Sequence, residues 1–435
     1  MATYLLKNVT LLDGVSFSPR SDMSLLIHDG IIAAIGHDLE SYDAEVIPLD
    51  GKFVMPGLID AHVHLMFSGK PAGGNTNKTP KRNAEAKFAK MLSKWPGSAL
   101  LKKSMRQSVM TSLNAGVTTM RCVGDMNYYD VDLRNDIRAG KLQGPRLLVS
   151  GPVLTPTGGH GAMFGHPVDS PMDARKYTRT NIAAQVDLIK IMSTGGVGDA
   201  KKIGDAGRLT MSADEITEAC REAHKAGLMV ATHCQSTEGM RLALRCGVDT
   251  IEHGGAMDDE IVELFLKNPN SLRGYSSMIP TLSPAMAYAK LDPAISHAKS
   301  AAIENSRLVV DGMIHGIHRA MGSGISLGIG TDATMSFVTH YNTWRELDFL
   351  IRYACLRPDQ VLALATRENA RILGIDDITG TLEVGKAADL LVLNDNPLTN
   401  IRTLQEPVMV MAGETFLRTP AVKRFPEVEA AWETI

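Results

Sequence analysis

The sequence has few cysteines and none in a CxxC pair. Its 5 cysteines are scattered over 435 residues, and an odd, dispersed set argues against a disulfide framework and for a reducing compartment. It also lacks an apolar run of roughly 18 residues, the length that a transmembrane helix needs. The first residues, MATYLLKNVTLLDG, alternate like a strand and lack the basic and long apolar parts of a signal peptide. We therefore expect a cytoplasmic protein.

A strong excess of charge of one sign is missing as well. The formal net charge is −3, so nothing indicates binding to nucleic acid or to an anionic membrane. Lysine and arginine gather between Lys78 and Arg106, but acidic and apolar residues interrupt them, as on a solvated helix face. With 44% hydrophobic and 21% charged residues, the composition is that of a globular protein. The expected partner is a small-molecule substrate.

Both ends of the chain have the sequence pattern of short β-strands separated by turns. In residues 1–56 apolar runs alternate with turns, and HDG at residues 28–30 predicts a hairpin. The stretches GTLEVGKAADLLVLN and EPVMVMAGETF, beyond residue 379, look the same. We predict one small β-sandwich domain built from residues 1–56 and 379–435, and a second domain over residues 57–378.

The middle of the chain alternates apolar runs with helical patterns. Ser212 and Glu215 form a capping-box signature ahead of one helical pattern, ADEITEACREAHKAG, whose last glycine is a helix-end signal. Eight such alternations predict an α/β fold, the (β/α)8 TIM barrel. The span is longer than the roughly 250 residues typical of that fold. The surplus lies in loops near 66–104 and 155–175, and the first is a candidate lid or, equally, a surface insertion.

The stretch LIDAHVHL, residues 58–65, places polar side chains in an apolar strand. Asp60, His62 and His64 occupy alternate positions and therefore share one face. In a barrel this face would look into the lumen near its C-terminal mouth, where two imidazoles one pleat apart can reach one metal ion. A polar strand facing water is the alternative, and the apolar lead-in FVMPG argues against it.

Other predicted strands end in candidate ligands too. His233 closes MVATHC, His253 closes TIEHG and Asp332 closes GIGTD. One such histidine alone is more often a hydrogen-bonded core residue, but the repetition at four strand ends is difficult to assign to packing. Imidazole and carboxylate ligands suit Zn²⁺ and similar divalent ions.

Lys190 lies inside the apolar run LIKIM. An unpaired ammonium is costly in such surroundings, and burial favours the neutral amine. A neutral amine can add CO₂ to form a carbamate, whose two oxygens can bridge two cations. An ion pair with an acid in the barrel lumen is an equally good interpretation.

Taken in order, these residues resemble the ligand set of the amidohydrolase superfamily. FVMPGLIDAHVHL is similar to its first-strand signature and GTLEVGKAADLLVLNDNPL to its closing motif. The resemblance implies that His62, His64 and Asp332 hold a more buried metal ion. It also implies that His233 and His253 hold a more exposed one, with a carboxylated Lys190 as the bridge. The implied cofactors are two divalent ions, zinc being the expected element.

The loops resemble the prolidase-like and imidazolonepropionase-related branch of that superfamily. Its TGGHG motif implies that His160 orients the substrate, and His166 in AMFGHP is a second candidate. Several relatives have HAY at the ligand that corresponds to His233, whereas this chain has His-Cys-Gln, so Gln235 stands in the place of a tyrosine. His340 follows Asp332 closely and is a further candidate for lining the pocket. A homo-oligomer is the commoner state in this family.

The resemblance implies an enzyme that hydrolyses an amide bond of a dipeptide or an N-acyl amino acid with a metal-bridging hydroxide. Asp332 would act as both ligand and general base, and His160 as a second catalytic residue. A lactone, carbamate or phosphotriester hydrolase on the same metals remains an alternative. So does a mononuclear deaminase or imidazolonepropionase-like enzyme, although Lys190 and the distance from His233 to the next acid, Glu238, argue against a deaminase.

Overall fold

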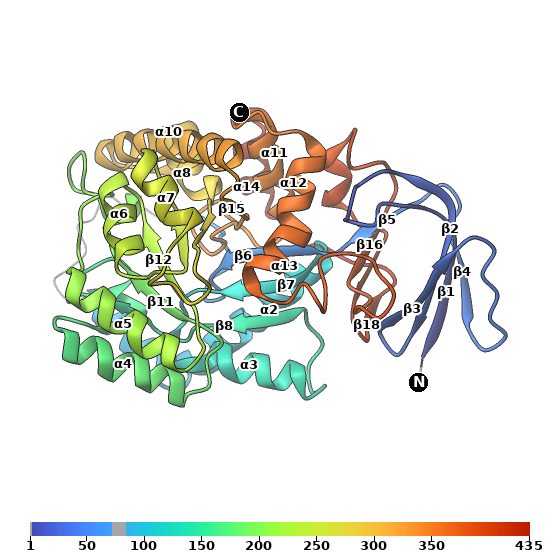
Figure 1. Ribbon diagram of the computed structural model, residues 1–435, viewed down its shortest axis with the longest axis horizontal. Helices are drawn as coiled ribbons and strands as arrows, with labels where there is room; N and C mark the ends of the chain where they lie inside the picture. Colours follow the sequence, from blue (N-terminus) through green and yellow to red (C-terminus); the bar gives the residue numbers. More distant parts are fainter. Residues whose placement is uncertain (1, 72–83) are drawn as a thin grey trace.

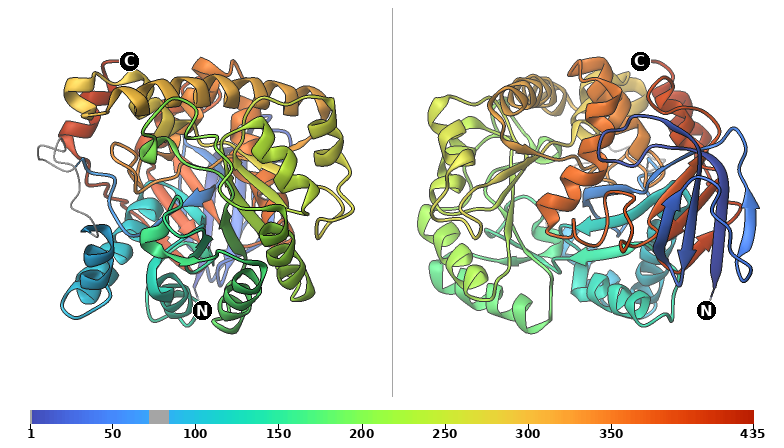
Figure 2. Two further views of the ribbon diagram at one scale, coloured as in Figure 1. Left: turned by 90° about the vertical axis from the view of Figure 1, so that its left-hand side faces the viewer. Right: turned by 45° about the vertical axis from the view of Figure 1, so that its right-hand side comes forward.

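The computed structural model describes residues 2–71 and 84–435. Its strands form one mixed sheet, made from both ends of the chain, and a set of parallel strands from the middle (Figure 1). The views in Figures 1 and 2 agree in placing helices around the outside of the parallel strands, with the mixed sheet at one side. Among the described residues, no helix has both the length and the apolar character needed to cross a bilayer.

The mixed sheet joins segments from the two ends of the chain. Strand β5 pairs with β1 on one side and with β16 on the other, and Asp29 and Gly30, both at positive φ, form the predicted hairpin turn between β2 and β3. The sheet has its own apolar core cluster, which includes Val9, Ile27 and Leu390. Its strands are β1 (Thr3–Leu11), β2 (Arg20–His28), β3 (Ile31–Gly36), β4 (Glu45–Pro48), β5 (Phe53–Pro56), β16 (Leu390–Leu393), β17 (Met409–Ala412) and β18 (Thr415–Leu417).

The middle of the chain supplies strands that all pair in parallel. One group has the order β6-β7-β8 and the other the order β10-β9-β11-β12-β13-β14-β15. Every apolar run predicted as a strand in this region overlaps one of them, and β9 and β10 are additional. They are β6 (Leu58–Val63), β7 (Val117–Cys122), β8 (Arg146–Val149), β9 (Val153–Thr155), β10 (Gly165–Pro167), β11 (Ile189–Met192), β12 (Val230–Cys234), β13 (Thr250–His253), β14 (Ser277–Ile279) and β15 (Ser326–Leu327).

Backbone hydrogen bonds also link the two parallel groups. The amide of Asp187 donates to the carbonyl of Val149 (2.7 Å), and the amide of Ala61 donates to the carbonyl of Ile329 (3.1 Å). The carboxyl ends of the strands therefore meet at one end of the domain. This is the edge at which parallel α/β sheets place ligands and catalytic groups.

The helices lie between the parallel strands in sequence. The capping box is present as predicted, because Ser212 N donates to Glu215 Oε2 (2.8 Å) and Glu215 N donates to Ser212 Oγ. The helices are α1 (Ala84–Leu92), α2 (Gly97–Asn114), α3 (Tyr129–Arg138), α4 (Pro171–Ala183), α5 (Ala213–Lys225), α6 (Thr237–Arg245), α7 (Asp259–Leu266), α8 (Leu282–Lys290), α9 (Pro293–Ser296), α10 (Ser300–Ser323), α11 (Thr343–Tyr353), α12 (Pro358–Ala363), α13 (Asn369–Leu373) and α14 (Pro426–Trp432).

The two long loops have partly regular structure. The candidate lid at 66–104 contains α1 and the start of α2, and its residues 72–83 lie outside the described residues. The loop near 155–175 contains a 3₁₀ turn, Ala162–Phe164, the strand β10 and the start of α4. Both loops follow parallel strands.

Helix α14 differs from the prediction for the C-terminal segment. The strand pattern predicts that residues 379–435 belong to the small β domain, yet within them α14 packs on α11, a helix from the middle of the chain (Figure 1). Arg345 of α11 donates to Glu429 of α14 (3.1 Å), and the rings of Phe349 and Trp432 lie 5.3 Å apart. The sequence pattern does not predict the contact between α14 and α11. Helix α14 has only 7 residues, and the residues that it contacts are far from it in the sequence.

Candidate active site

The predicted ligands meet at the carboxyl ends of the parallel strands. His62 lies in β6, Lys190 in β11, His233 in β12 and His253 at the end of β13, while Asp332 follows β15. All of them line one cavity of about 270 Å³. Residues that are up to 270 positions apart in the sequence, such as His62 and Asp332, therefore face one small volume.

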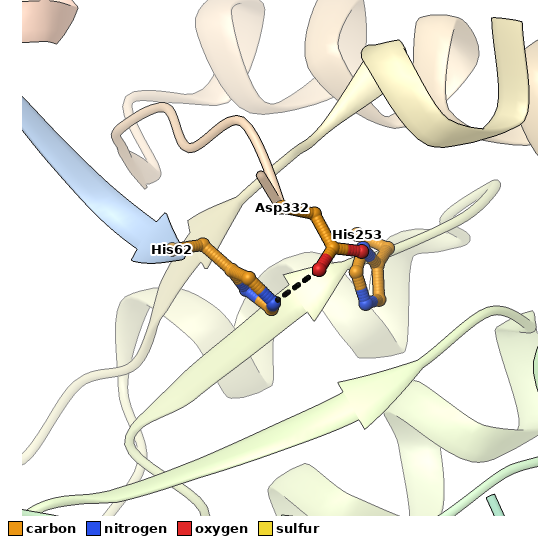
Figure 3. A group of neighbouring side chains, drawn as sticks. All are labelled: His62, His253 and Asp332. Carbon is orange, nitrogen blue, oxygen red and sulfur yellow. Dashed lines mark ion pairs between the residues drawn. The ribbon is translucent and has the colours of Figure 1, made fainter. Parts of the chain in front are cut away.

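Three of these side chains form the tightest group. Ligand atoms of His62, His253 and Asp332 all lie within 4.8 Å of one another, and Figure 3 shows the three side chains turned toward a common point. Asp332 Oδ1 is 3.6 Å from His62 Nε2 and 3.3 Å from His64 Nε2. One carboxylate oxygen therefore faces both imidazoles of the HxH motif.

The protein fixes which nitrogen of His62 and His64 faces the cavity. His62 Nδ1 donates to Glu252 Oε2 (2.6 Å), and His64 Nδ1 donates to the carbonyl of Gly124 (2.7 Å). Nε2 of each ring is thereby left facing Asp332. A hydrogen bond from the outer nitrogen is what orients histidine ligands in metal sites.

His233 and His253 are held in the same manner. His233 Nε2 donates to the carbonyl of Gly195 (3.0 Å), and His253 Nδ1 lies 2.6 Å from Thr281 Oγ1, which can accept a hydrogen bond from it. Their remaining nitrogens, His233 Nδ1 and His253 Nε2, are only 2.8 Å apart. The lone pairs of these two nitrogens repel each other at this distance unless a proton or a cation lies beside them. The two nitrogens can therefore act together as ligands of a metal ion.

The ionisation of the site also suits cations. Burial lowers the pKa of His233 and of His253 well below the ordinary value, and nearby positive charge acts in the same direction. Burial alone would raise the pKa of Asp332, but the charges and hydrogen bonds of His62 and His64 outweigh it and hold that pKa well below its usual range. Neutral imidazoles beside a carboxylate are a donor set for divalent metals.

Lys190 is fully buried, and its Nζ has no hydrogen-bond partner among the described residues. Burial lowers its pKa to about 8, although the negative charges of Glu252 and Asp332 oppose the change. A buried amine without a partner is costly. The nitrogen therefore fits either a charged neighbour or a covalent modification that turns it into a ligand.

A buried ion pair lies behind the first pair of ligands. Arg121 Nη2 is 2.8 Å from both oxygens of Glu252, and Thr250 Oγ1 donates to the same carboxylate (2.6 Å). Burial raises the pKa of Glu252, but Arg121 and His62 outweigh it and keep the carboxyl ionised. Glu252 thus connects β7, through Arg121, with His62 of β6.

His160 comes close to the metal ligands from the loop after β9. Its ring lies 4.3 Å from the ring of His233, and its Nδ1 pairs with Asp199. The approach requires glycine at position 196, since a Cβ there would lie 2.5 Å from His160 Cε1. Asp199 holds the ring, and Nε2 is left as the nitrogen that can meet a substrate.

The other cavity walls are apolar and amide groups. Gln235 lines the cavity, and its Oε1 is buried without a partner among the described residues. A Cβ added to Gly198 would lie 3.9 Å from both Tyr288 Oη and Met335 Cε, so the phenol of Tyr288 lies beside the cavity wall. Of the described residues that line the cavity, Lys190 is the one with a cationic side chain.

Two histidines proposed for substrate binding do not line this cavity. His166 lies in β10, where it stacks on Tyr177 (ring centroids 4.5 Å apart) and its Nε2 is 3.1 Å from Tyr128 Oη. His340 Nε2 donates to the carbonyl of His64 (2.8 Å). Both imidazoles meet partners inside the protein, and we do not retain them as substrate contacts.

Asp60 shares the strand face of His62, but its carboxylate binds the backbone and side chain of a neighbouring segment. It accepts the backbone amide of Thr331 (3.0 Å) and the hydroxyl of the same residue (2.6 Å). Burial raises its pKa to about 6, against the effect of these hydrogen bonds. Asp60 therefore ties β6 to the residue that precedes Asp332.

Sequence reasoning missed Arg121, Glu252, Asp199 and Tyr288. Glu252 could have been noticed, since it is a charged residue inside the apolar run that ends in His253. Arg121, in VTTMRCVG, carries the same signal. Asp199 and Tyr288 lie in a loop and a helix, where polar residues are common, so no local pattern marks them.

The family comparison agrees with the fold and the site. The model of the amidohydrolase family matches residues 53–414, and the chain belongs to that family. Its members generally use metal ions, and the structure brings together a His/Asp set that can bind one. The protein is accordingly a hydrolase that acts on carbon–nitrogen bonds.

Curated relatives and solved structures cover nearly the whole chain. Ochratoxinase from Aspergillus niger is 24% identical over 90% of this chain and 81% of its own length. Imidazolonepropionase from Mesorhizobium japonicum is 26% identical, over 88% of this chain and 89% of its own. The structure of a candidate prolidase from Bifidobacterium longum is similar with a TM-score of 0.87 and 38% identity, covering 100% of this chain and 98% of that one. The structure of a Xaa-Pro dipeptidase with bound methionine has a TM-score of 0.81 and 27% identity, covering 96% and 100%.

The contact between Glu252 and His62 predicts a role in metal retention. In Glu252→Gln the shape is kept, but the amide holds His62 Nδ1–H and Arg121 less strongly. We expect metal affinity to fall about 10- to 100-fold, as is typical when such an orienting partner is lost. The measurement is competition with a fluorescent chelator. Glu222→Gln, which removes a carboxylate of α5 that pairs with Arg179, is the control, and equal affinities for the two variants would contradict the role.

Proposed function

We propose that the protein is a binuclear metal-dependent amide hydrolase acting on a dipeptide of the prolidase type or on an N-acyl amino acid. The observation that carries the proposal is the convergence of four imidazoles, Asp332 and Lys190 on one cavity. We further infer that the parallel strands close into a (β/α)8 barrel, with the mixed sheet as a small β-sandwich domain. The backbone hydrogen bonds that link the two parallel groups support closure.

The two metal positions are those that the family resemblance implies, and the short distance between His233 Nδ1 and His253 Nε2 supports the second of them. His62, His64 and Asp332 would hold one divalent ion, and His233 and His253 the second. Lys190, carboxylated on Nζ, would bridge them, which explains a buried nitrogen without a partner. Nitrogen and oxygen donors in this number suit zinc.

In amide hydrolysis at such a site, the metal ions and the protein side chains have different roles. Divalent ions, when bound, acidify water and polarise a carbonyl oxygen. Asp332 accepts the proton of the attacking water and passes it to the leaving amine. His160, whose Nδ1 is held by Asp199, donates from Nε2 to the substrate carbonyl oxygen and stabilises the charge that develops on it.

The substrate class rests on the relatives and on the cavity. The B. longum structure is named for a candidate prolidase and a second neighbour for a Xaa-Pro dipeptidase, both at more than 25% identity. A cavity of about 270 Å³ with Phe164, Met163 and Met335 in its wall suits a small substrate with an apolar part. Gln235, with its unpartnered oxygen, can hydrogen-bond an N–H group of that substrate.

Removal of the bridging side chain predicts a loss of metal. In Lys190→Ala we expect the content to fall from about two to about one or fewer ions per chain, because one shared ligand serves both positions. Inductively coupled plasma mass spectrometry after gel filtration gives the ratio. Lys225→Ala removes a lysine that is exposed on α5 and should keep both ions. Unchanged metal content in Lys190→Ala would refute the bridge.

Removal of the proton acceptor predicts a loss of turnover. We expect Asp332→Asn to lower kcat by about 10²- to 10⁴-fold, the usual contribution of a general base, because an amide cannot take the proton. Steady-state kinetics at saturating metal gives kcat, and metal analysis on the same sample shows whether the ions remain. Asp359→Asn, at the exposed start of α12, is the control. Near-normal turnover of Asp332→Asn with ions bound would exclude this role.

The substrate proposal is tested with a panel offered to the zinc-loaded enzyme. It contains dipeptides that differ in the C-terminal residue, N-acyl amino acids and the C-terminal carboxamide of each compound, and released amine is measured by derivatisation and mass spectrometry. We expect release from one C-terminal residue type. The carboxamides show whether hydrolysis requires a free carboxylate on the substrate. Lactones, carbamates and phosphotriesters are offered in parallel, with mass spectrometry of their own hydrolysis products, and hydrolysis restricted to them would replace the proposal.

A further inference from the structure

The segment that carries Asp332 has a costly backbone conformation. We call residues 331–342 the Asp332 loop. Asp332 (φ 56°), Thr334 (φ 122°) and Phe337 (φ 69°) all adopt positive φ without being glycine. Such conformations persist only where the surroundings hold them, and a β-branched residue such as threonine is especially unfavourable there.

The first set of restraints on the Asp332 loop comes from the segment that follows β6. Asp332 N donates to the carbonyl of His62 (2.7 Å), and Phe337 N donates to the carbonyl of Gly69 (2.8 Å). The two backbones touch so closely that a Cβ at position 69 would lie 2.1 Å from the carbonyl oxygen of Val338. These contacts hold one side of the loop.

The second set comes from the C-terminal segment. Trp432 Nε1 of α14 donates to the carbonyl of Phe337 (2.8 Å), and the amide of Phe425 donates to Tyr341 Oη (2.9 Å). Glu429 accepts from Asn342 Nδ2 (3.3 Å). Trp432, Phe337 and Tyr341 are all nearly inaccessible to solvent, so these bonds are formed in an environment where an unsatisfied carbonyl would be costly.

Helix α14 therefore contacts the Asp332 loop without reaching the cavity. No residue of α14 lines the cavity, whereas Thr334 and Met335 of the loop do. Trp432 satisfies the carbonyl of Phe337, one of the three residues at positive φ. Loss of this bond allows the loop to relax toward an ordinary backbone conformation, and Asp332, at the other end of the same loop, moves with it.

We propose that α14, together with Phe425 just before it, is a positioning element of the active site, in which Trp432 and the amide of Phe425 hold the strained Asp332 loop and thereby place the Asp332 carboxylate. Trp432 and Tyr341 are positioning residues, since neither contacts the cavity. The role given to Asp332 rests on the proposed function. The coupling between α14 and the loop does not, and it is measured separately below.

The first test measures the loop itself. Trp432→Phe removes the indole N–H and keeps an aromatic ring in the core, and Tyr341→Phe removes the acceptor for Phe425. Hydrogen–deuterium exchange with mass spectrometry on the full chain follows a peptide that covers the loop. We expect exchange about five- to tenfold faster in each variant, the change that one net hydrogen bond is worth. Exchange unchanged in both variants would overturn the proposal, whatever the enzyme's substrate.

A matched control separates positioning from a general loss of stability. Ser276→Ala removes two buried hydrogen bonds just before β14, from Ser276 Oγ to the carbonyl of Val248 (2.7 Å) and from Asn268 Nδ2 to Ser276 Oγ (3.0 Å). It should lower Tm by at least as much as Trp432→Phe and leave exchange of the Asp332 loop unchanged. Equal acceleration of loop exchange in Ser276→Ala would show that α14 contributes stability alone.

The second test asks whether the loop matters to the site. With zinc present and a substrate from the panel, Trp432→Phe should lower kcat about five- to tenfold, leave KM within about twofold, and weaken zinc retention against a chelator. Faster exchange together with unchanged kcat and zinc retention would overturn the positioning role. If no compound of the panel is hydrolysed, exchange and zinc retention still decide the proposal, and only the proposed function fails.

Discussion

The site depends on one buried ion pair, Arg121 with Glu252. Both side chains are almost completely excluded from water, and burying two charges is favourable only where their remaining hydrogen bonds are satisfied. Here the guanidinium also donates to Thr250 Oγ1 (3.0 Å) and to the carbonyl of Ala61 (2.5 Å), and the carboxylate also accepts from His62. Strands β6, β7 and β13 are thereby held in one register, with His62 and His253 at the cavity.

The same burial sets the protonation of the donors. It favours the uncharged forms of His233 and His253, so the lone pairs that a cation requires are available near neutral pH, and it lowers the pKa of Lys190 to about 8. Asp332 is the exception, because His62 and His64 keep it ionised. A low-dielectric cavity with one retained carboxylate attracts cations without a large net negative charge. The formal net charge of −3 of the whole chain therefore does not indicate the electrostatic potential inside the cavity.

Much of the fold, and a set of candidate metal ligands, could be predicted from the sequence, for a physical reason. Strand periodicity is local, and each predicted parallel strand overlaps an observed one, with a candidate ligand at or beyond the carboxyl ends of β6, β12, β13 and β15. Contacts between distant segments leave no such pattern. Arg121 and Glu252 are 131 positions apart, and Phe337 and Trp432 are 95 apart. Likewise His166 and His340 look like site residues in the sequence, and only their partners, Tyr128 and the backbone of His64, show otherwise.

The mixed sheet has a consequence for the order in which the chain folds. Strand β5 has β1 on one side, but its other neighbour, β16, is synthesised only after the whole set of parallel strands. During translation the N-terminal strands therefore expose an unpaired edge, and their final pairing has high contact order, which is slow to form. Segments that are translated late then complete both the sheet and, through α14, the surroundings of Asp332. All the candidate metal ligands, up to Asp332, are thus synthesised before β16, which pairs with β5, and before α14, which contacts the Asp332 loop.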